Sequence, residues 1–188
     1  MKKTFLNNEI WILTFGGAFQ RAQVYSENYP EKTRIAFRKA LRDEVEKLVN
    51  NKYQVKVSEN EHITNIKSIV SFSNDLKVEN TNIPINFGVA QKMLNLYLKY
   101  LWCLGELKYE PTHFPVDRLI QIELNKITRN EKNKHLKIAP KKIEAWTQFK
   151  DESKYIDIIN LAKTIIDKVE VYKHFSLAQL ELTLFDRR

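Results

Sequence analysis

Two lysines and one aspartate are the side chains of this sequence best suited to covalent chemistry. Lys92 and Lys99 lie in a strongly apolar stretch, and Asp117 follows that stretch after a short loop. A lysine amine becomes a nucleophile when burial or a neighbouring cation lowers its pKa. An aspartate beside the amine can accept its proton or stabilise a developing positive charge. These residue types are the equipment of a Schiff-base-forming lyase. In a nucleic-acid enzyme they fit attack on the sugar carbon that carries a base.

The lysines belong to a segment, Ile85 to Leu104, that is apolar on nearly every side and long enough for about five turns of helix. Its Lys, Gln and Asn residues are too many for a membrane span. We therefore expect the central buried helix of the domain. Gly88, Lys92, Asn95 and Lys99 form one narrow stripe on it. A buried, unpaired ammonium costs several kcal/mol, so each lysine must reach an anion, a carboxylate or solvent.

The loop after this helix supplies a carboxylate. It is bounded by Pro111 and Pro115, and Pro115 is well placed to begin a new helix. Asp117 then falls in the first turn, where exposed amides favour a negative side chain. One interpretation is a partly buried ion pair between Lys92 and Asp117 that only joins two helices. The other is a catalytic pair. His113, held between the two prolines, either packs the loop or takes part in the site.

The segments GVAQK (residues 88–92), Lys99 and FPVDR (residues 114–118) carry a resemblance. Together they resemble the core of the archaeal 8-oxoguanine DNA glycosylases, which belong to the helix-hairpin-helix glycosylase superfamily. The resemblance implies that Lys92 attacks C1′ of a flipped-out nucleotide and that Asp117 assists base loss. The Gly-rich hairpin that binds DNA phosphate in most of that superfamily is missing, and only Gly88 stands in its place. The chain is also similar to small uncharacterised bacterial proteins that share its KYLWCLG, PVDR and SLAQLEL segments.

The resemblance also extends the candidate site beyond the catalytic pair. Gly88 would allow close backbone approach, and Lys99 would hold a phosphate. The residues expected to contact substrate are Gly88, Gln91, Asn95, Lys99, His113 and Arg118. No cofactor is implied.

A basic segment, Lys126 to Lys142, follows the predicted pair of helices. Beside the site, such a segment could neutralise phosphates of a nucleic-acid backbone, or it could be a solvated surface loop. The candidate phosphate-binding residues are Arg129, Lys132, Lys134, Lys137, Lys141 and Lys142. Arg129 and His135 also match the short spacing of HEPN-type RNases, so a ribonuclease is a further alternative.

Composition narrows the classes of function that remain. The net charge of +8 over 188 residues fits a partner with a phosphate backbone. One cysteine and four scattered histidines give no zinc-ligand spacing, and no Gly-rich phosphate loop occurs. We expect Cys103 to fill the core, and a single free thiol favours a reducing, cytoplasmic compartment. Neither a cleaved signal peptide nor a transmembrane helix is expected.

Few glycines and prolines and strong helical periodicity predict an all-α fold. We expect one compact domain over residues 1–188 with about six to eight helices, a short strand or linker at 52–57 and a loop or hinge at 74–82. His62, in the first turn of a helix that Ser58 caps, is expected at the surface. Predicted helices cover 9–25, 31–50, 58–71, 85–104, a segment from Pro115, 152–172 and a last helix after Ser176.

Two classes other than a glycosylase remain open from the sequence. The first is a non-enzymatic nucleic-acid-binding protein in which the basic segment binds phosphates and the Lys92–Asp117 pair is structural. The second is a protein-interaction module whose charge only aids solubility. The sequence contains no signal for an oligomeric state.

Overall fold

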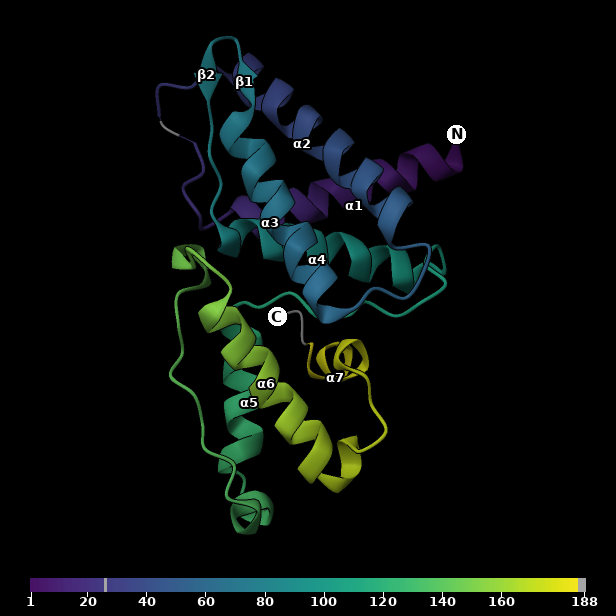
Figure 1. Ribbon diagram of the computed structural model, residues 1–188, viewed down its shortest axis with the longest axis vertical. Coiled ribbons are helices and arrows are strands. Elements are labelled where there is room, and N and C mark those ends of the chain that lie inside the picture. The colour runs from purple at the N-terminus through teal and green to yellow at the C-terminus, as the bar shows by residue number, and fades with distance from the viewer. Residues whose placement is uncertain (26, 186–188) are drawn as a thin grey trace.

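Helix α4 (Phe87–Cys103) crosses the middle of the molecule in the computed structural model, which describes residues 1–25 and 27–185 (Figure 1). Thirteen of its 17 residues are buried, which confirms the predicted central helix. Asn86 begins the helix, because its side chain accepts a hydrogen bond from the amide of Val89. Helices from the N-terminal half pack on one side of α4, and those from the C-terminal half lie on the other (Figure 1).

Three helices form the N-terminal half: α1 (Lys2–Phe19), α2 (Glu31–Lys52) and α3 (Glu59–Asp75). The expected start of the first helix at residue 9 is wrong. Asn7 and Asn8 lie inside α1 and bond to α2, where Asn7 donates to Glu46 and Asn8 accepts from Arg42. From the local sequence, one of these asparagines was expected to cap the helix, but both side chains make tertiary contacts instead.

Of the two alternatives predicted for 52–57, a short strand or a linker, the structure has the linker, which follows the end of α2 at Lys52. Strands occur instead in the expected hinge, where β1 (Lys77–Val78) pairs antiparallel with β2 (Thr81–Asn82). Glu79 and Asn80 both have positive φ, as a two-residue hairpin turn of this kind requires. The Asn82 amide donates to three carbonyls at the end of α3, which ties the hairpin down.

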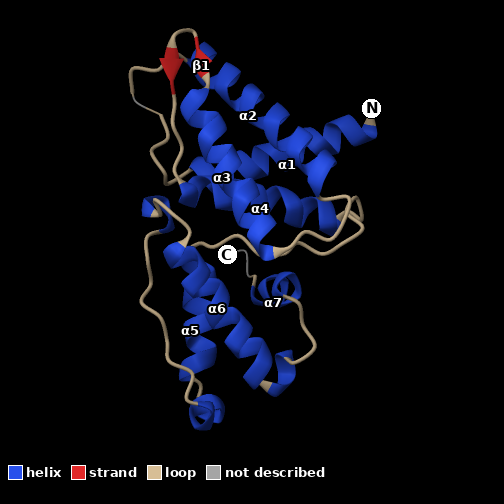
Figure 2. Ribbon diagram, viewed as in Figure 1, coloured by secondary structure: helices blue, strands red, loops and turns tan. Residues whose placement is uncertain are grey.

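The C-terminal half is also helical (Figure 2). The predicted helix at 152–172 ends at Lys168, and a separate turn follows it. Ser176 caps the last helix through a capping box, as expected. The elements are α5 (Arg118–Arg129), η1 (Glu131–Leu136), η2 (Trp146–Gln148), α6 (Ser153–Lys168), η3 (Glu170–Tyr172) and α7 (Leu177–Leu184).

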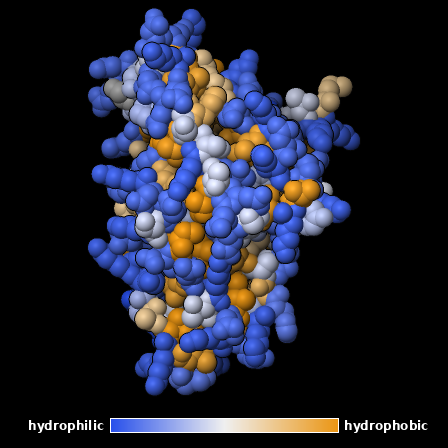
Figure 3. Space-filling model, viewed as in Figure 1, coloured by the Kyte–Doolittle hydropathy of each residue, from blue (hydrophilic) through white to orange (hydrophobic). Residues whose placement is uncertain are grey.

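Figure 3 shows hydrophilic side chains over most of one face, with apolar atoms visible between them. Within the described residues, no helix is long and apolar enough to cross a membrane.

Gly88 marks the closest approach between α4 and the C-terminal half. Its amide donates to the carbonyl of Phe149 at 3.0 Å, and a Cβ added at Gly88 would lie 1.8 Å from the carbonyl oxygen of Trp146. The close backbone approach expected at this glycine therefore exists, but the neighbour is the chain itself.

Gly88→Ala is expected to lower the free energy of unfolding by about 1–3 kcal/mol, because the backbone at Trp146 must move away. Denaturant unfolding measures the change. Gly16→Ala is the control: its Cβ would meet nothing within 4 Å, and alanine in a helix interior should stabilise by roughly 0.5–1 kcal/mol. Equal effects of the two substitutions would contradict the proposed contact.

Candidate functional site

Lys92 and Asp117 meet at the boundary between the two halves of the molecule. The Nζ of Lys92, from the middle of α4, lies 3.4 Å from the Oδ2 of Asp117 at the start of α5. The lysine side chain is 11% exposed and the aspartate side chain 28%. The structure thus brings together the two residues proposed as the catalytic pair, and the partly exposed carboxylate leaves one side of the pair in contact with solvent.

Asp117 is held in place by its role as the N-cap of α5. Its Oδ1 accepts hydrogen bonds from the amides of Leu119 at 2.8 Å and Ile120 at 3.1 Å. One carboxylate oxygen therefore fixes the side chain, and the other faces the amine. The helix expected from Pro115 begins three residues later, at Arg118, so Asp117 is its N-cap and not a residue of its first turn.

The surroundings of Lys92 favour its neutral form. Burial lowers the pKa of the amine, the charge of Arg21 lowers it further, and Asp117 opposes both by favouring the protonated form. The net direction is down. The Nζ also lies 4.2 Å from the centroid of the Trp146 ring, a cation–π distance that, like Asp117, favours the protonated amine. The lowered pKa, which burial causes, is the feature that Lys92 shares with an activated amine.

A cleft of about 160 Å³ opens at this pair. Cavities of this size hold a single small ring, and sites for larger ligands are usually 300 Å³ or more. The cleft thus accommodates a sugar or a phosphate more readily than a complete nucleoside. Its walls are Gly17, Gln20, Arg21, Lys92, Asp117, Arg118, Leu119 and Trp146.

The cleft contains residues that sequence reasoning did not select. Gln20 and Arg21 follow the end of α1, and Trp146 belongs to η2. Nothing in their local sequence places them near Lys92, since 71 residues separate Arg21 from Lys92. Arg118, which was expected to contact substrate, does line the cleft and is exposed.

Three of the expected substrate contacts are instead internal supports. The buried Gln91 amide donates to the carbonyl of Val116 at 2.8 Å and accepts from its N–H at 3.1 Å, which anchors the loop before Asp117. Asn95 and His113 are fully buried and both bond to the hydroxyl of Tyr155, each at 3.0 Å. None of these three side chains lines the Lys92 cleft. These side chains support the surrounding helices and loop and do not point into the cleft.

Lys99 does not hold a phosphate in this arrangement. Its Nζ lies 2.8 Å from each carboxylate oxygen of Glu181 on α7, and both side chains are less than 10% exposed. The ring of Phe185 lies 3.6 Å from the ammonium on another side. Burial raises the pKa of Glu181, and the charge of Lys99 opposes this increase. The pair is a buried link between α4 and α7.

The basic segment lies away from the cleft. Helix α5 carries the chain from Asp117 to Arg129, about 18 Å, before the segment turns at η1. Arg129, Lys132, Lys134 and Lys137 are therefore at the far end of α5 (Figure 1). Local carboxylates pair with several of its lysines: Lys134 with Glu131, Lys141 with Asp157, and Lys142 with Glu144. We expected this segment to form a cationic rim beside Lys92, but it does not. The cations that line the cleft are Arg21 and Arg118.

A second polar cluster surrounds two buried histidines. His62, expected at the surface, is fully buried and bonds to the hydroxyl of Tyr53 at 2.8 Å. Its ring lies 4.9 Å from that of His113 in an edge-to-face arrangement. Burial lowers the pKa of each histidine to about 3, so both are neutral at physiological pH. The position of His62 in the helix did not reveal this, because the covering residues come from distant segments.

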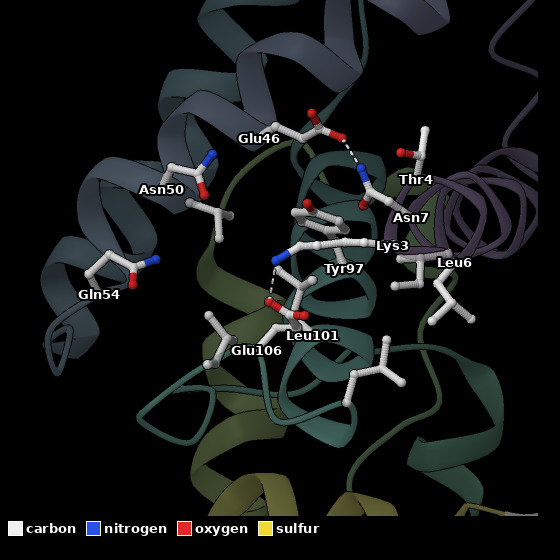
Figure 4. Close-up of a pocket in the computed structure, with 14 residues that line it drawn as sticks. Lys3, Thr4, Leu6, Asn7, Glu46, Asn50, Gln54, Tyr97, Leu101 and Glu106 are labelled. Carbon is white, nitrogen blue, oxygen red and sulfur yellow. Dashed lines mark hydrogen bonds and ion pairs between the residues drawn. The ribbon is translucent and has the colours of Figure 1, made fainter. Parts of the chain in front are cut away.

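A larger cavity of about 450 Å³ lies between the start of α1 and the end of α4 (Figure 4). Its polar groups are largely satisfied by one another: Lys3 pairs with Glu106, and Asn7 donates to Glu46. Most other walls are aliphatic side chains such as Leu6 and Leu101. The cavity therefore offers no nucleophile with an activating partner.

Residues 1–25 and 27–185 contain no group of three or more potential metal ligands. Cys103 is exposed in the last turn of α4, so the expected role in the core is wrong. That turn extends past the packed core, and Leu104 beside it is also exposed.

No protein-family model matches the chain, and comparison with curated proteins and with solved structures also finds no match. These comparisons neither support nor oppose the resemblance to the glycosylases. The functional proposal therefore depends on the cleft at Lys92.

Proposed function

We propose that this protein is a DNA glycosylase/lyase-like enzyme in which Lys92 is the nucleophile and Asp117 its partner. The observation that carries the proposal is the buried amine of Lys92, which lies 3.4 Å from a carboxylate in a cleft that opens to solvent. Burial of the amine favours the neutral, nucleophilic form. The resemblance to the glycosylases over residues 88–118 supports the same assignment.

In this mechanism the lone pair of Lys92 attacks C1′ of a deoxyribose. The bond from C1′ to the base breaks and the leaving base takes up a proton; at a site that has already lost its base, the amine adds to the C1′ aldehyde instead. Loss of water or opening of the sugar ring then gives an imine. Asp117 accepts the proton that the amine releases and passes it to the leaving base, or to the departing sugar oxygen or hydroxyl. As a carboxylate again, it stabilises the positive charge of the iminium.

The size of the cleft selects among these substrates. About 160 Å³ suits the sugar, whereas a base attached to it would have to rest outside. Arg21 and Arg118 at the walls are available to the flanking phosphates. We therefore infer that a site already lacking its base is the better substrate. The single free thiol, Cys103, agrees with a reducing, cytoplasmic location.

Incubation with abasic DNA and borohydride tests the nucleophile. Hydride reduces the imine to a stable secondary amine, so we expect a covalent protein–DNA adduct. Lys92→Gln should abolish the adduct, and Lys132→Gln, at an exposed lysine in the basic segment, should leave it unchanged. The rate of trapping should rise with pH and level off below the ordinary lysine pKa of 10.5, because the pKa of Lys92 is lowered.

Asp117→Asn separates the catalytic role from the structural one. Asparagine keeps the N-cap oxygen but removes the charge, so the fold should survive. Trapping should fall by about 100-fold if Asp117 acts in proton transfer. Equal trapping by Lys92→Gln and the unaltered protein would remove Lys92 from the role. Salt-dependent DNA binding without any adduct, unaffected by Asp117→Asn, would favour the non-enzymatic alternative.

A further inference from the structure

An apolar groove of about 860 Å³ runs between α1 and α2. Ile12 on α1 and Ile35 on α2 line its walls while 63% and 54% exposed. Gly16 lies at the groove, and a Cβ there would meet nothing within 4 Å, so the surface is open to a close neighbour. Exposed isoleucines lining a hollow of this size indicate a surface that another molecule covers.

Three aromatic rings continue along the groove. The ring centroids of Phe15 and Phe19 are 5.1 Å apart, and those of Phe19 and Tyr25 are 5.8 Å apart. Arg38 lies over the Tyr25 ring at 6.0 Å. These rings are packed against one another and therefore lose little conformational entropy on binding. Aromatic residues and arginine are enriched among the residues that contribute most of the binding energy in protein–protein interfaces.

The charges at the groove all have the same sign. Its charged residues are Arg38, Lys39 and Arg42, and no carboxylate is among the described residues that line it. Arg38 bonds to Glu31 and to the side chain of Tyr25, and Arg42 donates to Glu46 and Asn8. Each guanidinium therefore retains N–H groups for a further acceptor. A second copy of this chain, with its net charge of +8, would be repelled, whereas an acidic partner would be attracted.

We propose that this groove binds an acidic amphipathic helix of a partner protein. The part of α1 that borders the groove, from Asn8 to Gln20, is about 18 Å long and matches three turns of such a helix. Apolar side chains at positions i, i+4 and i+7 would occupy the space between Ile12 and Ile35, and flanking glutamates would reach Lys39 and the arginines. The most exposed apolar side chains of the groove, Ile12 and Ile35, are aliphatic, whereas the rings of Phe15, Phe19 and Tyr25 already pack against one another. This favours the apolar face of a helix over single-stranded nucleic acid, whose bases stack on open aromatic faces.

The proposal does not depend on the chemistry of Lys92. The probe is a fluorescein-labelled synthetic helical peptide of about 12 residues, with leucine or phenylalanine at the stripe positions and glutamate on the flanks. We expect anisotropy titration with the full chain to give saturable binding that weakens with salt. A scrambled peptide without the stripe should bind at least roughly tenfold more weakly.

Two variants in the groove locate the site, and two elsewhere serve as controls. Ile35→Glu should weaken peptide binding at least roughly tenfold, while Val171→Glu, at a residue that is 72% exposed on η3, should not. Lys39→Glu should weaken binding of the acidic peptide. It should strengthen binding of a peptide whose glutamates are replaced by lysine. Lys92→Gln should bind the peptide normally, which separates this test from the lyase test.

Any of three results would overturn the proposal. The first is equal binding of the scrambled peptide or of Ile35→Glu. The second is a concentration-dependent dimer that Ile35→Glu dissociates, which would make a second copy the occupant. The third is a single-stranded oligonucleotide that binds with the same dependence on Ile35 and displaces the peptide.

Discussion

Replacing Lys99 by methionine is expected to lower the free energy of unfolding by about 3–5 kcal/mol, although Lys99 is not assigned to the cleft. The substitution leaves the carboxylate of Glu181 buried without its counter-ion, and burial already raises the pKa of that group. In a chain of this size the melting temperature should fall by roughly 10 °C. Denaturant unfolding followed by circular dichroism measures the free energy directly.

A double variant isolates the cause of this loss. Lys99→Met combined with Glu181→Leu removes both charges and should recover most of the stability, because two apolar side chains can replace a buried pair. Lys3→Met is the matched control: its pair with Glu106 is exposed and should contribute less than about 1 kcal/mol. A double variant as unstable as Lys99→Met alone would assign the cost to lost packing rather than to an orphaned charge.

Acidification from pH 7 to pH 5 is expected to lower the free energy of unfolding by about 4 kcal/mol through His62 and His113. The pKa of each is about 3 in the folded protein and near 6.5 when unfolded. Below pH 6.5 the unfolded chain therefore binds protons that the folded chain does not. Stability is lost as the pH falls through 6.5, and each histidine contributes a slope of about 1.4 kcal/mol per pH unit between its two pKa values.

Variants at the two histidines test this assignment. His62→Gln and His113→Gln should each lower stability at pH 7, because a buried hydrogen bond is altered, but each should also reduce the pH slope by about half. His135→Gln, at an exposed residue on η1, should leave the slope unchanged. Glu59 lies 3.9 Å from His113 but is already bound to Lys163, so its carboxylate offers little compensation for a proton on the ring. If the free energy of unfolding does not change between pH 7 and pH 5, the two histidines accept protons in the folded protein as readily as in the unfolded chain.

Both predictions concern groups outside the Lys92 cleft. Asn95 and His113 share the hydroxyl of Tyr155, and Gln91 bonds to the loop before Asp117. If the proposed function holds, loss of these internal hydrogen bonds should reduce trapping by displacing Lys92 or Asp117 without removing either group. Trapping assays on any variant should therefore be run at a pH and temperature where its fold is shown to be intact.

The sequence by itself determined the all-α class and the central helix, and it placed Asp117 near the start of a helix, although that helix begins three residues after Pro115. These predictions follow from local rules, because the period of apolar residues specifies a buried helix and Pro and Asp favour helix starts. The capping boxes at Ser58 and Ser176 were predictable for the same reason. Each involves residues within a few positions of one another.

Only the tertiary structure decided which acid each lysine meets. Lys92 and Lys99 have similar local sequences, yet one reaches Asp117 in an open cleft and the other reaches Glu181 in the interior. The burial of His62 and the arrival of Arg21 at the cleft were equally hidden. Helical periodicity records which face of a segment is apolar but not which distant segment covers it. For this reason the candidate nucleophile could be named from the sequence, whereas its surroundings, and with them its chemistry, required the folded chain.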